Sequence, residues 1–228
     1  MLLPIAVFVV AGQTGGASAT ASAGGFPAFI KMPGVTPSGL AVDKVSNVYV
    51  SIRETIGGIL FGKIWKYTPA GEQSLFAEIG TAEIYGLAVA SNGDLYAAMA
   101  RVGSDKGVYR VDRKGQIELL PGSDQIVFAN ALAFDDRGTL YITESYSGAP
   151  IDYGQGGIWR IPRGGEAELW IRHGLDFPAS LAFGTGKGER TNLFVTNLGL
   201  GKNFVPQLPW AGPGLVKIDA GVPGRPVH

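Results

Sequence analysis

The chain has 228 residues, of which 46% are hydrophobic, and its 19 basic and 19 acidic residues leave no net charge. This length and composition predict one domain with a sizeable core. Because no basic cluster stands out, the sequence gives no support for binding to nucleic acid or to an anionic membrane surface. The absence of cysteine excludes disulfide bonds, thiolate metal sites and cysteine nucleophiles.

The first predicted element is a leader over residues 1–23. Its apolar run, MLLPIAVFVVAG, is too short to span a bilayer comfortably, and Ala-x-Ala sites end at Ala19 and Ala23. We interpret the leader as a secretory signal peptide cleaved near Ala23, with a membrane tether or a disordered leader as alternatives. This interpretation predicts a secreted or periplasmic protein with no stable membrane insertion after cleavage, whose folded domain covers residues 24–228.

Four similar segments follow one another along the rest of the chain. Each contains a matched leucine, and these leucines, which are 47, 45 and 49 residues apart, are Leu40, Leu87, Leu132 and Leu181. A second signature lies behind each leucine: a glycine, an alternating aromatic and basic strand, a turn and a final strand, as in GGIWRIPRGGEAELWI. Each unit therefore supplies four strands, and the units cover about residues 38–79, 86–120, 130–171 and 180–219.

This repeat predicts an all-β fold, namely a β-propeller of four-stranded antiparallel blades. The first strand of a unit, such as 132–134, is apolar on both faces, so neighbouring sheets must cover it. No stretch has the 3.6-residue period of a helix, which disfavours helical repeats. The last unit has only three clear strands, and we expect the segment 27–32 to complete it. In that arrangement Phe29–Met32 pairs with Leu215–Ile218 and closes the ring.

Four units are few for a propeller ring. Either the ring has four blades or whole units are missing, and a loss near Gly174–Asp176 would leave the repeat period undisturbed. Extra repeat units in the genomic sequence at this junction would decide between the two. The oligomeric state also stays open, because an unclosed ring would have to pair its open edges with another copy.

The unit NALAFDDRGTLYITES followed by GGIWRI resembles the senescence-marker-30/gluconolactonase/strictosidine-synthase-like superfamily, and DFPASLAFGTGKGERTNLFVTN resembles its secreted gluconolactonase-like members. The resemblance implies a propeller that typically has six blades. In the hydrolases of the family it also implies one divalent cation, usually calcium, held on the axis by Glu, Asn and Asp side chains. Asn130 matches a metal-ligand Asn of the family, whereas the corresponding positions in the other units are Ser38, Tyr85 and Ala179. Such a cation would polarise a lactone carbonyl or activate a bound water.

Polar residues gather where the second strand of each unit ends. We expect Glu144 to act as a general base or metal ligand, and Arg53 and Arg101 to orient the substrate by clamping a carboxylate. Together with the resemblance, this indicates a calcium site of Asn130, Glu144 and Asn197. The alternative is that these are solvated loop residues or mutually satisfied ion pairs. Nearby loops are rich in apolar and aromatic residues, which predicts substrate contacts by Tyr85, Tyr146, Tyr153, Phe204 and Trp210.

These observations predict a secreted, metal-dependent hydrolase of lactonase or esterase type that acts on a small, hydrophobic or aromatic molecule. Two alternatives stay open: a non-enzymatic propeller that binds a ligand or a protein, and an incomplete, inactive copy of a six-bladed enzyme. A Ser–His–Asp triad is disfavoured because no Gly-x-Ser-x-Gly motif accompanies His173. Aspartates in tight turns, including Asp43, Asp112 and Asp135, are expected to cap the backbone.

Overall fold

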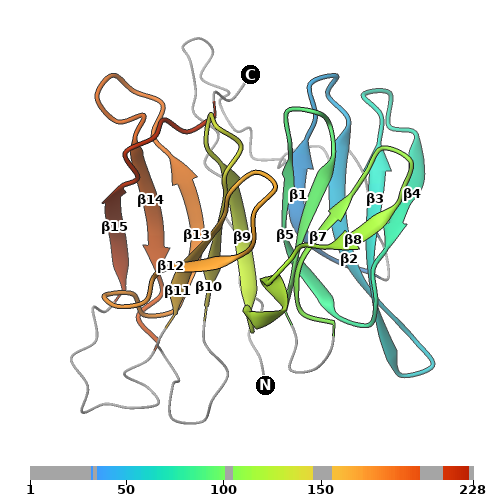
Figure 1. The fold of residues 1–228 in the computed structure, drawn as a ribbon. Coiled ribbons are helices and arrows are strands. Elements are labelled where there is room, and N and C mark those ends of the chain that lie inside the picture. The colour runs from blue at the N-terminus through green and yellow to red at the C-terminus, as the bar shows by residue number, and fades with distance from the viewer. Residues whose placement is uncertain (1–31, 33–34, 101–104, 146–155, 201–212, 226–228) are drawn as a thin grey trace, which may run out of the picture.

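The computed structural model describes residues 32, 35–100, 105–145, 156–200 and 213–225. Within these residues the chain forms antiparallel β-strands and one short 3-10 turn, η1 (Ser123–Gln125). The strands make four sheets, or blades, which follow one another in chain order (Figure 1). The predicted leader lies outside the described residues, and no helix in the described part has the length and apolar character needed to cross a membrane.

Each repeat unit corresponds to one blade, and its strands pair with their neighbours in chain order. Blade 1 consists of β1 (Thr36–Val42), β2 (Val48–Ile56), β3 (Ile59–Tyr67) and β4 (Gln73–Glu78). Blade 2 consists of β5 (Glu83–Val89), β6 (Leu95–Ala100), β7 (Gly107–Val111) and β8 (Ile117–Leu119). Blade 3 consists of β9 (Ala129–Phe134), β10 (Leu140–Glu144), β11 (Gly157–Ile161) and β12 (Glu168–Ile171). Blade 4 has three strands, β13 (Pro178–Phe183), β14 (Asn192–Asn197) and β15 (Gly214–Asp219).

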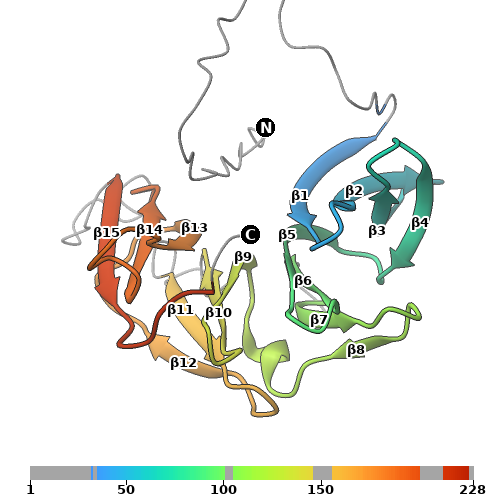
Figure 2. The same cartoon turned by 90° about the horizontal axis from the view of Figure 1, so that it is seen from above.

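Seen from above, the blades lie side by side around an axis, with the first strand of each blade innermost (Figure 2). β1 contacts β5, β5 contacts β9 and β9 contacts β13, so each blade packs on the next. The described strands form an arc that is open between blades 1 and 4 (Figure 2). The all-β propeller architecture is thus confirmed. Closure of the ring by the segment 27–32 stays a prediction, because 27–31 lie outside the described residues.

Apolar cores fill the spaces between consecutive blades. The core between blades 1 and 2 contains Tyr49 and Ile64 from blade 1 and Leu95 and Met99 from blade 2. Similar cores lie between blades 2 and 3 and between blades 3 and 4. Burial of one such side chain stabilises the fold by about 1.5–3 kcal/mol. The cores between blades therefore hold the arc together.

The junction around Gly174–Asp176 leads from blade 3 directly into blade 4. Leu175 lies in the core between these blades with Tyr141 and Leu193, and Asp176 is fully buried. Blades 3 and 4 therefore pack on each other through an apolar core, as the preceding pairs do. Whether whole units were lost at this junction stays a prediction.

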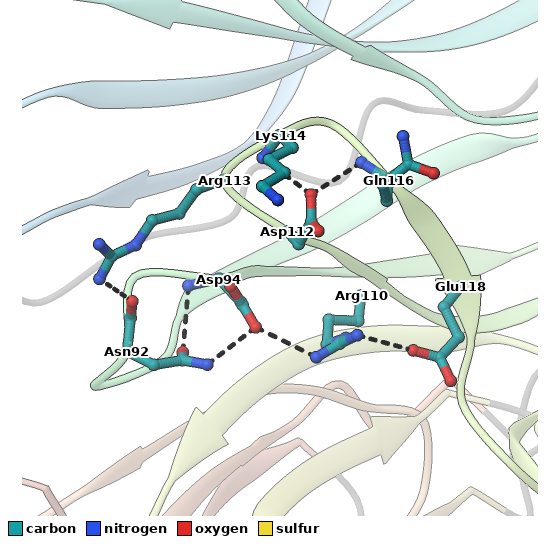
Figure 3. Close-up of polar contacts among 8 residues, drawn as sticks. All are labelled: Asn92, Asp94, Arg110, Asp112, Arg113, Lys114, Gln116 and Glu118. Carbon is teal, nitrogen blue, oxygen red and sulfur yellow. Dashed lines mark hydrogen bonds and ion pairs between the residues drawn. The ribbon is translucent and has the colours of Figure 1, made fainter.

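Aspartates cap the tight turns at the upper end of Figure 1, as the sequence predicts. Oδ1 of Asp112 accepts the backbone N–H groups of Gln116 and Lys114, each at 2.8 Å (Figure 3). Asp43 and Asp135 accept the equivalent pairs of N–H groups in their own turns. The hydrogen bond from Gln116, supported by the one from Lys114, lowers the pKa of Asp112. These carboxylates are structural.

Candidate functional site

The residues singled out from the sequence gather at the lower end of Figure 1, where the inner strands begin and the second strands end. The segments 101–104, 146–155 and 201–212, which follow β6, β10 and β14 at this end, lie outside the described residues. Five of the predicted residues consequently lie outside the described residues: Arg101, Tyr146, Tyr153, Phe204 and Trp210. The other five are described: Arg53, Tyr85, Asn130, Glu144 and Asn197.

Glu144, the last residue of β10, is buried and holds two hydrogen bonds. Its Oε1 accepts the backbone N–H of Val127, and its Oε2 accepts the indole N–H of Trp159, both at 2.8 Å. Trp159 belongs to the core between blades 2 and 3, so the carboxyl group lies at the edge of this core. Burial raises the pKa of Glu144, although the bonds from Trp159 and Val127 act in the opposite direction.

Asn130 bonds toward the other side of blade 3. Its Nδ2 donates to Oγ of Ser145 at 3.0 Å, and the Ser145 hydroxyl donates to the carbonyl of Pro178 in blade 4 at 2.9 Å. All three residues are buried. Asn130 therefore helps to join blade 3 to blade 4, while Glu144 faces blade 2.

Asn197 ends β14 at the position that Glu144 has in β10. Its Oδ1 accepts the backbone N–H of Asp176 at 2.6 Å, and both residues are buried. This bond fixes the chain just before Phe177, whose φ of 54° is unusual for a residue other than glycine. The amide thus stabilises a strained entrance to blade 4.

Tyr85 and Arg53 meet at a common carboxylate. Oε2 of Glu83 accepts the Tyr85 hydroxyl at 3.0 Å and pairs with Nη1 of Arg53 at 3.3 Å, which joins blade 1 to blade 2. The ring of Tyr85 also lies 4.9 Å from that of Phe128, at 46° to it. Sequence reasoning named Tyr85 and Arg53 but missed Glu83 and Phe128. Glu83 could have been found from the sequence, because it lies two residues before Tyr85 on the same strand and such residues share a face of the sheet.

A cavity of about 380 Å³ opens at the opposite, upper end, between blades 2 and 3. The rings of Tyr96 and Phe134 meet there edge to face, with centroids 5.1 Å apart. Arg110 in its wall pairs with Asp94 at 3.3 Å and with Glu118 at 2.9 Å (Figure 3). The cationic group of Arg110 is thus already matched by two carboxylates. The sequence did not indicate this cavity, because its lining comes from turns and strand ends of two different units.

No protein-family model matches the chain, and no curated protein matches it. Solved structures do resemble it. A luciferin-regenerating enzyme superposes with a TM-score of 0.60 at 17% identity, over 84% of this chain and 64% of that one. A gluconolactonase from Xanthomonas campestris gives a TM-score of 0.54 at 18% identity, over 84% and 62%. Virginiamycin B lyase from Staphylococcus aureus gives 0.50 at 14% identity, over 80% and 55%.

The fold is that of the gluconolactonase-like propellers. At these identities the likeness is one of architecture, which many different activities share. The chain spans between 55% and 64% of the lengths of these three solved chains. The comparison therefore leaves the activity to be argued from the residues of this chain.

The calcium ion implied by the family resemblance needs about six to eight oxygen ligands that converge on one point. In this propeller the three expected ligands bond in different directions: Asn130 toward blade 4, Glu144 toward blade 2, and Asn197 to the backbone of Asp176. The described residues also contain no cluster of three or more His, Cys, Asp or Glu side chains. This donor set does not fit a calcium site, and we derive no catalytic step through a metal.

Proposed function

We propose that the lower end of this propeller binds a small molecule that has an aromatic ring and an anionic group. The observation that supports the proposal is the cluster of Tyr85, Phe128, Glu83 and Arg53. In it the Tyr85 hydroxyl and the Arg53 guanidinium meet at the Glu83 carboxylate, and the Phe128 ring packs on that of Tyr85. Neither ring is fully buried, and the Arg53 side chain is 42% exposed. The cluster therefore has both apolar surface and charge within reach of a ligand.

The chemistry of the cluster matches such a ligand. An aromatic ring packed on Tyr85 and Phe128 in an offset or edge-to-face arrangement contributes about 0.5–1.5 kcal/mol beyond the area it buries. A guanidinium has five N–H donors, and the contact with Glu83 involves Nη1, so Arg53 has further donors for a carboxylate. Glu83 in turn orients the Tyr85 hydroxyl.

Calorimetric titration with phenylacetate and indole-3-acetate tests this proposal. We expect saturable binding that weakens about tenfold, or about 1.4 kcal/mol, in Tyr85→Ala. Tyr96→Ala at the upper cavity is the matched control and should leave the affinity within about twofold, since Tyr96 lies at the other end of the blades. Absence of saturable binding, or equal weakening in both variants, would overturn the proposal.

A secreted hydrolase of lactonase or esterase type is the second candidate. The observation that favours it is Glu144, whose pKa is raised by burial, because a raised pKa suits a carboxyl group to general acid–base catalysis near neutral pH. In this function Arg53 and Arg101 would orient the substrate. A cation held by Asn130, Glu144 and Asn197, which the family resemblance implies, is not needed for this function, since these side chains bond in different directions.

Two measurements test the second candidate. Hydrolysis of δ-valerolactone and 4-nitrophenyl acetate should fall at least about a hundredfold in Glu144→Gln, which is the size of effect general acid–base groups have. Calcium titration tests the metal separately, and because Asn130, Glu144 and Asn197 bond in different directions we expect no binding that Asn130→Ala changes. Hydrolysis that is undetectable, or unchanged by Glu144→Gln, contradicts the enzyme. Calcium binding that Asn130→Ala abolishes would contradict the misfit of the donor set.

A further inference from the structure

A short segment connects Glu144 with the aromatic rings at the lower end of the propeller. It consists of the three residues between η1 and β9. Ile126 is fully buried in the core between blades 2 and 3. The N–H of Val127 donates to Oε1 of Glu144 at 2.8 Å, and the ring of Phe128 packs on that of Tyr85. The N–H that Glu144 accepts therefore belongs to the residue directly before Phe128.

The backbone of Phe128 lies between blades 2 and 3 and is held from both. Its carbonyl accepts the N–H of Ser145, the residue after β10, at 3.1 Å. It also forms an antiparallel bridge with Ala100, the last residue of β6 in blade 2. The Phe128 side chain is only partly buried, so the place of its ring depends on how this backbone is held.

Blade 4 repeats this arrangement with a different polar side chain. Asn197 has the position in β14 that Glu144 has in β10, and its Oδ1 accepts the backbone N–H of Asp176. The next residue is again aromatic, Phe177, and its carbonyl accepts the N–H of Leu198 at 3.1 Å. In both blades, a polar side chain at the end of the second strand thus holds the backbone directly before an aromatic residue.

The neighbouring strand explains why one blade has a carboxylate and the other an amide. Trp159, which donates its indole N–H to Oε2 of Glu144, corresponds to Val216 in blade 4. Valine has no polar donor, and the amide of Asn197 has a single acceptor oxygen. Glu144 meets two donors, and its carboxylate supplies one oxygen for each. The bond to the backbone is the part that the two blades share, so holding this segment is the common role of the two side chains.

We propose that Glu144 is a positioning residue of the ligand site: by holding the backbone N–H of Val127, it keeps the ring of Phe128 against that of Tyr85. This inference rests on the proposed function, in which these two rings contact the aromatic part of the ligand. A ring that is already in place loses less conformational freedom when the ligand binds, so the fixed backbone raises the affinity. In this role Glu144 itself needs no contact with the ligand.

Calorimetric titration of the full chain with phenylacetate tests this role through two substitutions of one residue. Glu144→Met introduces the residue that blade 2 has at the matching position, Met99, and removes the acceptor; we expect about tenfold weaker binding. Glu144→Gln keeps one acceptor oxygen for the Val127 N–H and should restore the affinity to within about threefold of the wild type. A role in stability alone would not separate these two variants while both are folded.

Thr143→Val is the matched control. Thr143 precedes Glu144 on β10, and its buried hydroxyl accepts the N–H of Ala131 and donates to the carbonyl of Ala179 in blade 4. This variant should leave the affinity within about twofold. If the wild type does not bind phenylacetate, the proposed function fails and this inference with it. If the wild type binds and Tyr85→Ala weakens binding, but Glu144→Met does not, this inference alone is wrong. Equal weakening by Glu144→Met and Glu144→Gln, or by Thr143→Val, also contradicts it.

Hydrogen exchange of the wild type gives a test that needs no substitution of Glu144. Coupling between two equilibria is reciprocal, so a ligand that benefits from the fixed segment must also stabilise that segment. We expect saturating phenylacetate to slow exchange of the Val127 N–H at least about fivefold, and that of the Ala131 N–H by less than about twofold. No slowing at Val127, or equal slowing at both amides, would overturn the proposal.

Discussion

Trp159 donates its indole N–H to Oε2 of Glu144 across 2.8 Å, at the edge of the core between blades 2 and 3. In this contact a buried indole N–H satisfies a buried carboxylate oxygen. It explains how the fold accommodates an acidic residue at a position where blades 1 and 2 have Ile52 and Met99. A carboxyl group without such partners would cost several kcal/mol at this place.

The first prediction concerns the pH dependence of stability. Because burial raises the folded-state pKa of Glu144 above its usual 4.5, the folded protein binds more protons than the unfolded chain in the interval between the two values. Stability therefore falls as pH rises through this interval. We expect the free energy of unfolding of the wild type, relative to Glu144→Gln, to decrease as the pH rises above about 4.5. Urea denaturation at several pH values measures it, and a difference that stays constant or increases would contradict the raised pKa.

The second prediction isolates the indole N–H. Trp159→Phe keeps most of the apolar ring but removes the donor, which should lower the free energy of unfolding by about 1–3 kcal/mol. The control is Trp65→Phe, at the matching position of blade 1, where β3 pairs with β2 and Ile52 stands in place of Glu144. Chemical denaturation of both variants gives the comparison. Equal losses would show that the hydrogen bond to Glu144 adds nothing to ring packing.

The strands could be predicted from the sequence because each unit repeats the same local pattern. The expected strand 132–134 lies within β9, and the two strands expected in GGIWRIPRGGEAELWI are β11 and β12. These elements depend on alternation and turns, which are local properties of the chain. The Asp turns follow for the same reason, as with Asp112.

Which way the side chains of the site residues point could not be predicted from the local pattern of one unit alone. Glu144 was expected to face the axis, yet alternation along β10 places it on the same face as Leu140 and Ile142, both of which lie in the core between blades 2 and 3. That signal was present in the sequence. The contact of Glu83 with Arg53, by contrast, joins two blades and depends on how the blades are placed, which no single unit encodes. The arc that the described strands form likewise depends on how the four blades are placed.

The third prediction concerns the hydroxyl that joins blade 1 to blade 2. Ser51→Ala removes the acceptor of the Gly39 N–H and the donor to the Ile84 carbonyl, all in buried surroundings. We expect a loss of about 1–3 kcal/mol in the free energy of unfolding. Ser74→Ala on the exposed part of β4 is the control, with an expected change within about 0.5 kcal/mol. A loss at Ser51 no greater than that at Ser74 would mean that water or backbone groups replace the hydroxyl.

The fourth prediction concerns the close approach of blades 2 and 3. A Cβ at Gly86 would lie 2.1 Å from the backbone oxygen of Asn130, so Gly86→Ala must push the inner strands β5 and β9 apart. Overpacking of this kind typically costs about 1–3 kcal/mol. Gly186→Ala is the control, because a Cβ there has no atom within 4 Å. Thermal unfolding should show a clearly lower midpoint for the first variant and little change for the second. Equal midpoints would mean that the two blades separate without cost, which the buried packing of Leu140 and Ile142 argues against.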